Sequence, residues 1–331
     1  MHGVKRREWT QELVRQKRLR DVEKIVAYKT LTNDVLSAKK DGVFTHQKLD
    51  TTRKLLELNP EFNAVWNYRR DLISALKSEL SLEFWNNELA FTMQQLKLFP
   101  KVYWIWNHRL WCLNHFPQSP IGKWQQELAI VSKLLTMDAR NFHGWHYRRV
   151  VVGRLEQMLH TSLNQQELDF TTEKINANIS NFSAWHQRAN LLPKMFEKGQ
   201  VSNEKSFVEH EFRYIINAMF TDAEDQSVWF YIKWFVKSDI VTKSLSPGEY
   251  ASLLQDLKDN ITLINEDELE FSGKENMWCL KILCVLEELQ MKDVGRVETQ
   301  QRKILDKLTK IDPLRQNRYL HLAQDSKENV D

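Results

Sequence analysis

Apolar residues recur along this chain at spacings of three and four, in stretches separated by short breaks. Leu128, Val131, Leu134 and Leu135 form one such stretch, and their spacing places them on one face of an α-helix. Each break contains Pro or an Asx residue, which end one helix and start the next. The pattern therefore predicts helices in pairs joined by tight turns. The five clearest breaks are Asn59-Pro60, Phe99-Pro100, Asp138-Ala139, Asn178-Ile179 and Asp222-Ala223.

A tryptophan marks the second helix of each predicted pair. Successive copies stand 40, 39, 40 and 44 residues apart, and an Arg follows three residues after each of the first four. A period near forty is typical of an array of helical hairpins, each of which buries its apolar face against its neighbours. The five tryptophans are Trp66, Trp106, Trp145, Trp185 and Trp229.

A glutamate marks the first helix of most pairs, eighteen residues before the tryptophan. Because Arg at plus three lies beside Trp on one helix face, we interpret the repeated Trp, Glu and Arg as scaffold rather than as a surface for stacking bases. Glu and Arg are then expected to form ion pairs, within a repeat or between neighbours. The predicted pairs are Glu88–Arg109, Glu127–Arg148 and Glu167–Arg188.

The array becomes irregular toward the carboxyl end. Trp278 follows Trp229 by 49 residues, with the extra length around residues 244–268, and Tyr319 occupies the tryptophan position of a last weak copy. We expect about seven helical pairs in a curved solenoid with an atypical end that acts as a cap. The predicted organisation is one helical-repeat domain over residues 1–331, with a basic arm and first helix at 1–44, five clear repeats at 45–235, and degenerate repeats and a cap at 236–331.

Composition agrees with an all-α fold. With 9 Gly and 7 Pro among 331 residues, the chain has too few turn residues for an all-β protein. The net charge of +3 gives no reason to expect a nucleic-acid-binding protein. The first 24 residues hold eight Lys or Arg against four acids, which is typical of a solvated helix or arm. Such a segment can also bind nucleic acid, a membrane surface or an acidic partner.

The cysteines and the hydropathy bear on location. Cys112, Cys279 and Cys284 lack metal-ligand spacing and are expected to be reduced core thiols in a reducing compartment. No apolar run approaches the roughly 20 residues that a bilayer-spanning helix needs, and no signal peptide opens the chain. We therefore expect a cytoplasmic protein without a transmembrane segment.

Candidate chemistry lies where the repeats disagree. Five residues before Trp, in the turn that leads into the second helix, only the second and third repeats are basic, with Lys101 and Arg140. A cation beside a helix amino terminus favours anions, and Tyr103 and His143 are placed to donate hydrogen bonds to phosphate oxygens or a leaving group. The alternative is that both cations are ordinary surface residues.

Other catalytic signatures are absent from the sequence. His143 and His146 stand three residues apart, but no third ligand follows at a compatible spacing, so a metal site on this chain is not expected. The chain has no nucleophile motif, no Gly-rich phosphate loop and no paired-carboxylate signature. By itself it does not look like a complete enzyme.

The repeats resemble those of protein prenyltransferase α subunits. The resemblance rests on Pro-Lys-x-Tyr-x-x-Trp-Asn-His-Arg at residues 100–109 and Asp-Ala-Arg-Asn-Phe-His-Gly-Trp-His-Tyr-Arg-Arg at 138–149, and it is strong over residues 45–235. It implies a crescent-shaped, right-handed superhelix of helical hairpins that wraps around a zinc-bearing β subunit. Such a heterodimer attaches an isoprenoid to a cysteine thiol.

Within that family the chain resembles the Rab geranylgeranyl transferase type in its fungal form. It opens Met1-His2-Gly3 before turning basic, it lacks an acidic, proline-rich leader and inserted domains, and its fifth repeat reads Phe-Thr-Asp-Ala-Glu-Asp-Gln-Ser-Val-Trp-Phe-Tyr at 220–231. The implied partners are a β subunit, a Rab escort protein, a Rab GTPase substrate and geranylgeranyl diphosphate. The alternatives are the α subunit shared by farnesyl and type I geranylgeranyl transferases, and a non-catalytic repeat scaffold.

The resemblance also implies roles for single residues. By motif, Lys101 and Tyr103 are the catalytic pair facing the isoprenoid diphosphate, and His143 matches a family histidine in the next turn. The comparison of charges adds Arg140 to Lys101 and His143 on the diphosphate side. Phe142 stands where the family often has Tyr, so a phenol-dependent role is not carried over to that position. Zinc is expected on the β subunit and not on this chain, although His2 would become a ligand of that zinc if the amino-terminal arm reaches it.

Overall fold

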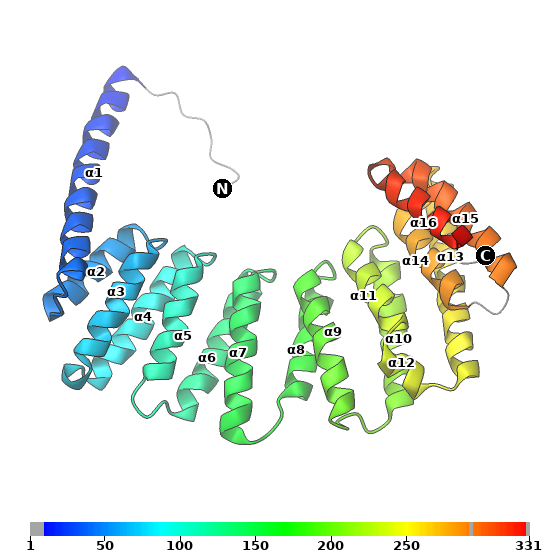
Figure 1. The fold of residues 1–331 in the computed structure, drawn as a ribbon, viewed down its shortest axis with the longest axis horizontal. Helices are drawn as coiled ribbons and strands as arrows, with labels where there is room; N and C mark the ends of the chain where they lie inside the picture. The colour runs from blue at the N-terminus through cyan, green and yellow to red at the C-terminus, as the bar shows by residue number, and fades with distance from the viewer. Residues whose placement is uncertain (1–9, 291–293, 329–331) are drawn as a thin grey trace. The chain divides into compact units, whose positions relative to one another are not determined.

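The computed structural model describes residues 10–290 and 294–328, and every regular element in these ranges is a helix (Figure 1). The predicted all-α class is confirmed. Contacts divide the chain into two compact units, residues 1–160 and 161–331, and each is described by itself.

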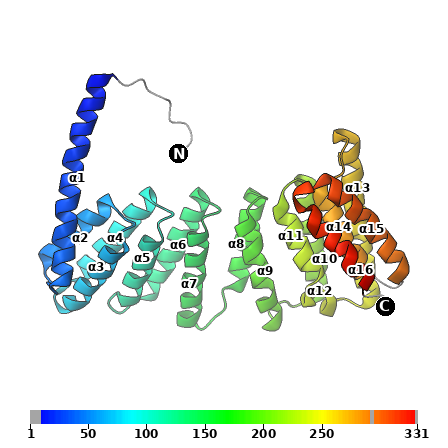
Figure 2. The same ribbon diagram turned by 45° about the horizontal axis from the view of Figure 1, so that its top comes forward.

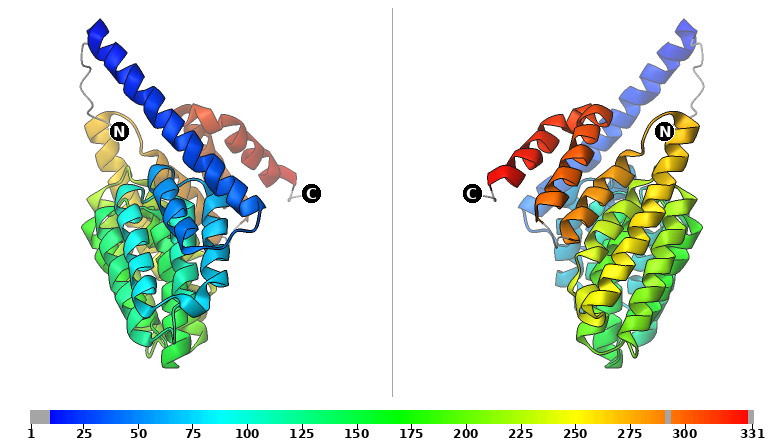
Figure 3. Two further views of the ribbon diagram at one scale, coloured as in Figure 1. Left: turned by 90° about the vertical axis from the view of Figure 1, so that its left-hand side faces the viewer. Right: turned by 90° about the vertical axis from the view of Figure 1, so that its right-hand side faces the viewer.

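The first unit contains a long helix followed by three helical hairpins. The long helix contacts α2 and α3 and buries Val35 and Ala38 near its carboxyl end, whereas its amino-terminal half extends past the hairpins (Figures 1 and 3). Its helices are α1 (Gln11–Lys40), α2 (His46–Leu58), α3 (Asn63–Ala75), the short 3₁₀ helix η1 (Lys77–Glu79), α4 (Leu82–Leu98), α5 (Tyr103–His115), α6 (Ile121–Met137) and α7 (Phe142–Leu159).

The second unit contains four more hairpins and one short extra helix. The hairpin partners α13 and α14 lie side by side (Figure 2). Its helices are α8 (Asn164–Ala177), α9 (Phe182–Glu197), α10 (Glu204–Thr221), α11 (Gln226–Val236), α12 (Asp239–Ser244), α13 (Pro247–Ser272), α14 (Met277–Leu289), α15 (Val294–Ile311), the 3₁₀ helix η2 (Pro313–Arg315) and α16 (Gln316–Glu328).

The described ranges therefore contain seven hairpins, as the period predicts. The extra length near residues 244–268 forms the short helix α12 and the 26-residue helix α13. The tryptophan position of the sixth repeat was predicted two residues too early in the sequence. The N-cap residue lies four before Trp in α3, α5, α7, α9 and α11, and the N-cap of α14 is Asn276, so buried Leu280 and not Trp278 occupies the tryptophan position.

The repeated tryptophans fill the core and also hold the turns. All five are buried, and in each the indole N–H donates to the backbone carbonyl six residues earlier, in the turn between the two helices. This bond explains why Trp rather than Phe recurs, because a buried carbonyl without a donor is costly. The acceptors are Pro60, Pro100, Ala139, Ile179 and Ala223, at 2.8–2.9 Å.

Three of the repeated arginines join their own hairpin to the next one. Arg109 shows the arrangement: one guanidinium nitrogen donates to the Leu89 carbonyl and the Thr92 hydroxyl of its own repeat, and two others bind both carboxylate oxygens of Glu127 in the following repeat. The pairs are Arg69 with Glu88 (2.6–2.7 Å), Arg109 with Glu127 (2.5–2.8 Å) and Arg188 with Glu211 (2.6 Å).

The register predicted for these ion pairs was wrong by one repeat. Glu88 and Glu127 each bind the Arg of the preceding repeat, and Arg188 binds the Glu of the following one. The physical reason is that one guanidinium nitrogen of each Arg binds the first helix of its own repeat, through a backbone carbonyl and a Thr in Arg69 and Arg109 and through two Thr in Arg188. The other two nitrogens then bind the carboxylate of the next repeat. The side chain two residues after Trp forms a further hydrogen bond with the glutamate carboxylate: His108 with Glu88, Tyr147 with Glu127 and Tyr231 with Glu211.

Removal of the indole N–H is expected to destabilise the fold. Trp229→Phe takes away the donor to the Ala223 carbonyl and leaves a small cavity, so we expect a loss of about 2–3 kcal/mol in the free energy of unfolding. Trp234→Phe on the same helix is the matched control. Trp234 is half-buried and makes no indole hydrogen bond in the described structure, so a loss under about 1 kcal/mol is expected. Urea unfolding followed by circular dichroism measures both, and equal losses would contradict the role of the indole bond.

Candidate functional site

Two turns of the first unit carry the residues that the sequence singled out. The α4–α5 turn contains Lys101, and Tyr103 is the first residue of α5. No side chain caps the start of α5, where the N-cap is Val102. The amide groups of its first turn are therefore available to an anion. The α6–α7 turn contains Arg140, and His143 is the second residue of α7.

Lys101 presents a nearly free cation. Its side chain is 75% exposed, and its only ion pair in the described structure is a 3.8 Å contact with Asp138 of the α6–α7 turn. An exposed pair at that distance contributes little stability, so an incoming anion can displace the carboxylate at little cost. The pair also shows that the two turns lie within side-chain reach of each other.

Three aromatic side chains of the same two turns contact one another. Tyr103 is 48% exposed, and its ring centroid lies 6.0 Å from that of His143. Phe142 is 68% exposed and lies 4.0 Å from the same imidazole. Gly144 is buried, and a Cβ there would lie 3.0 Å from Leu135, so glycine lets the first turn of α7 approach α6 closely. The structure thus brings Lys101, Tyr103, Phe142 and His143 together.

His143 is uncharged at neutral pH. Partial burial lowers the pKa of its imidazole, although a hydrogen bond to the backbone of Lys101 opposes that shift. A lowered pKa keeps the ring uncharged at pH 7. His143 can therefore hold a hydrogen-bonding position next to the anion site without adding a second full charge.

Arg140 is exposed, and within the described residues it forms no ion pair. Its turn carries it near the same end of the hairpins, but no contact joins it to Lys101, Tyr103 or His143. Arg140 therefore remains a candidate by position alone.

Sequence reasoning missed two polar residues beside the site. Arg70 of α3 is half-buried and binds the side-chain oxygens of Asn67 (2.6 Å) and Asn107 (2.5 Å), with no carboxylate partner in the described structure. Burial lowers the pKa of Arg70, and the nearby phenol of Tyr103 acts in the opposite direction. Comparison of the repeats at plus four, where Arg70 and Arg149 stand, would have found it. The second is Asn141, whose position in the sequence indicates only an ordinary helix cap.

One buried cluster contains three groups of the kind that bind metals. Glu88, His108 and Cys112 lie with their ligand atoms within 4.8 Å of one another. The carboxylate of Glu88 is already bound by Arg69 on both oxygens and by His108. Burial raises the pKa of the Cys112 thiol and lowers that of His108, so both are neutral at pH 7. The cluster is thus a linked part of the repeat scaffold, with His108 in the position where the first, third and fifth repeats have Tyr.

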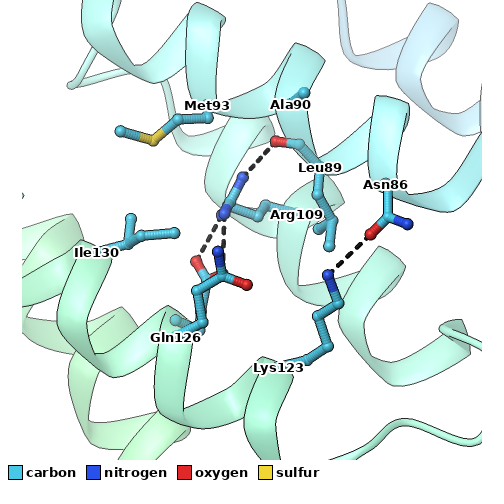
Figure 4. A pocket seen from close by; sticks show the side chains of 9 residues that line it. Asn86, Leu89, Ala90, Met93, Arg109, Lys123, Gln126 and Ile130 are labelled. Atoms are coloured by element: carbon cyan, nitrogen blue, oxygen red, sulfur yellow. Dashed lines mark hydrogen bonds and ion pairs between the residues drawn. The ribbon is translucent and has the colours of Figure 1, made fainter. Parts of the chain in front are cut away.

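A cavity of about 250 Å³ lies between α4 and α6, and Arg109 of α5 also lines it (Figure 4). Leu89, Met93 and Ile130 supply its apolar wall. Its polar groups bind one another: Lys123 donates to Asn86 at 2.8 Å, and Arg109 pairs with Glu127. The cavity contains none of the residues of the two turns.

Two further expectations concern the ends of the chain and the membrane. His2 lies outside the described residues. None of the helices in the described ranges has the length and hydropathy that a bilayer crossing requires.

The repeats match a known family. The protein prenyltransferase alpha subunit repeat matches residues 46–76, 85–116, 124–155 and 164–195. These segments coincide with the hairpins from α2–α3 to α8–α9, which include both turns of the candidate site.

Similar proteins extend that match to nearly the whole chain. The geranylgeranyl transferase type-2 subunit alpha of Saccharomyces cerevisiae is 57% identical over 327 residues, covering 99% of this chain and all of that protein. The protein of the same name from Candida albicans is 35% identical over 359 residues, covering 96% of each. The Rattus norvegicus protein is 34% identical over 249 residues, which are 71% of this chain and 42% of that protein.

A solved structure has a similar fold. Candida albicans protein geranylgeranyltransferase-I complexed with GGPP matches with a TM-score of 0.63 at 19% identity, over 91% of this chain and 90% of that one. At this identity the likeness concerns the fold alone.

Proposed function

This chain belongs to the family of type 2 geranylgeranyl transferase alpha subunits, and from that premise we propose how it acts in catalysis. As an α subunit it works in a heterodimer with a β subunit. The reaction is transfer of a geranylgeranyl group from geranylgeranyl diphosphate to a cysteine thiol. We propose that the α4–α5 and α6–α7 turns hold the diphosphate.

The observation that carries the proposal is the state of Lys101. A cation that is 75% exposed and only weakly paired stands beside the uncapped start of α5 and within reach of the next turn. Tyr103 and neutral His143 add hydrogen-bond donors on the same side. This combination of a point charge, free amides and neutral donors suits an anion with several oxygens.

The transfer reaction requires stabilisation of the diphosphate leaving group. The thiol sulfur forms a bond to the allylic carbon C1, the bond from C1 to the diphosphate oxygen breaks, and the thiol proton is released. Negative charge builds on the diphosphate as that bond breaks. Lys101 stabilises this charge, and Tyr103 donates a hydrogen bond from its phenol. Neutral His143 has one N–H, which can turn from the backbone of Lys101 to the diphosphate.

We propose that the zinc of the heterodimer is bound by the β subunit. Bound there, zinc supplies the acceptor cysteine as a thiolate, which is a stronger nucleophile than the thiol at neutral pH. On this chain the one buried cluster of metal-binding groups in the described ranges has its carboxylate occupied by Arg69, which does not favour a cation there.

The acceptor and its escort are further parts of the proposal. The resemblance to the Rab type implies that the acceptors are carboxyl-terminal cysteines of Rab GTPases, presented by a Rab escort protein. Relatives named geranylgeranyl transferase type-2 subunit alpha are similar over nearly the whole chain. Their similarity supports the type 2 enzyme, and with it the Rab acceptor, over the α subunit shared by farnesyl and type I geranylgeranyl transferases.

Transfer by the purified heterodimer tests the function. The chain is co-expressed with its β subunit and assayed with labelled geranylgeranyl diphosphate on a Rab GTPase with two carboxyl-terminal cysteines, with and without the escort protein. We expect transfer only when the escort is present. Efficient transfer to free CaaX peptides without an escort would indicate the α subunit shared with farnesyl transferase. No transfer to either acceptor would favour a scaffold.

A further inference from the structure

The buried side chain of Asn141 connects the two turns of the proposed diphosphate site. It is 6% exposed and stands at the N-cap of α7. Its carboxamide oxygen accepts hydrogen bonds from the backbone N–H groups of His143 (3.0 Å) and Gly144 (3.3 Å). Its amide nitrogen donates to the backbone carbonyl of Pro100, at 3.0 Å, in the preceding repeat.

Each end of this carboxamide binds the backbone of a proposed site residue. The Pro100 carbonyl belongs to the peptide group whose nitrogen is that of Lys101, and the same carbonyl also accepts the indole N–H of Trp106 at 2.9 Å. At the other end the N–H of His143 is bound directly. A shift of Asn141 would therefore change the position of Lys101 relative to His143.

We propose that Asn141 is a positioning residue, which holds Lys101 and His143 at the spacing that the diphosphate requires. The inference rests on the proposed function of the two turns. Its physical basis is that a misplacement of about 1 Å at a reacting centre can cost up to about 10²-fold in rate. Two charged or polar groups on separate hairpins need ties between their turns, and Asn141 adds a buried one to the hydrogen bond between His143 and the backbone of Lys101.

Helix capping alone does not account for Asn141. At the same position α5 has Val102, which makes no cap, and α11 has Asp225, which caps but has no amide to donate. Asn181 caps α9 without using its amide nitrogen. In the described structure the full arrangement recurs once, in the second unit, where Asn276 caps α14 and donates to the Ala223 carbonyl at 3.2 Å.

Asn276 gives a matched control for the experiment. Serine is a good N-cap residue that keeps the acceptor and loses the amide donor. Asn141→Ser and Asn276→Ser therefore remove the same kind of bond between hairpins, one inside the proposed site and one outside it, and Asn276→Ser also removes a bond to the Glu224 carboxylate at 2.7 Å. We expect a small decrease in the midpoint of thermal unfolding for both variants, at least as large for Asn276→Ser as for Asn141→Ser. In the heterodimer we expect Asn141→Ser to lower kcat about tenfold and Asn276→Ser to leave it unchanged.

A double-mutant cycle with Lys101→Ala separates positioning from structure. If Asn141 acts through Lys101, Asn141→Ser lowers kcat in the wild-type background and has little further effect once Lys101 is gone. Equal losses of kcat in the two Ser variants, or a tenfold loss that persists in the Lys101→Ala background, would overturn the inference. If Lys101→Ala itself leaves kcat unchanged, the proposed function of the turn fails first, and the positioning role fails with it.

Discussion

Replacing Lys101 by Ala is expected to lower the turnover of the heterodimer by about 10²–10³-fold, with a change of less than about threefold in the dissociation constant of geranylgeranyl diphosphate. The difference arises because the diphosphate gains negative charge only as its bond to C1 breaks. In the ground state the exposed ammonium is solvated and weakly paired with Asp138, so its removal costs little binding.

Single-turnover kinetics and equilibrium binding of the isoprenoid diphosphate measure the two quantities separately. Lys97→Ala, in the last turn of α4, removes an exposed charge four residues away and is the matched control for net charge. Lys101→Arg keeps the charge and should recover part of the rate. Equal losses in rate and affinity would mean that Lys101 acts on the ground state, and an unchanged rate would exclude it from catalysis.

The second large effect concerns stability. Glu88→Gln is expected to reduce the free energy of unfolding by about 3–5 kcal/mol, because it leaves the buried guanidinium of Arg69 without its counter-charge. Glu57→Gln, in the exposed pair with Arg53, is the matched control and should cost under about 0.5 kcal/mol. Urea unfolding of both variants decides the point, and a loss below about 1 kcal/mol for Glu88→Gln would contradict a structural role for the buried pair.

The same carboxylate predicts a pH dependence. Burial by itself would raise the pKa of Glu88, but the charge and hydrogen bonds of Arg69, with His108, hold it well below its usual range. A folded-state pKa below the unfolded value, about 4.3, means that the contribution to stability is fully present above that pH and is lost as the pH falls toward the folded value. Glu88→Gln should therefore flatten the decline of stability in acid.

Much of the fold could be predicted from periodicity because the tryptophans serve two purposes at once. Trp106 fills the core and binds the Pro100 carbonyl, so its position relative to the turn cannot drift. The pairing of each Arg with a particular Glu was harder to predict. The Glu and Arg positions were found, but a repeat of forty residues places the Glu of the same and of the next hairpin at equivalent positions, and only three-dimensional packing selects Glu127 for Arg109.

The candidate site was predictable only where a residue differed from those at the same position in the other repeats. Lys101 and Tyr103 are distinctive in sequence, and the structure places them beside His143. Asn141 was not distinctive, because Asn at an N-cap is common and its second bond, to Pro100, joins residues 41 positions apart. Arg70 was not singled out from the sequence, and the side chains of Asn67 and Asn107 orient it in the structure.

The central claim is that the diphosphate binds at the α4–α5 and α6–α7 turns of this chain. The most direct measurement is an experimental structure of the heterodimer with geranylgeranyl diphosphate bound. The account predicts that Lys101 leaves Asp138 and lies within salt-bridge distance of the diphosphate, with Tyr103 and His143 within hydrogen-bond distance of its oxygens. A diphosphate held by the β subunit alone, with Lys101 still paired to Asp138, would contradict it.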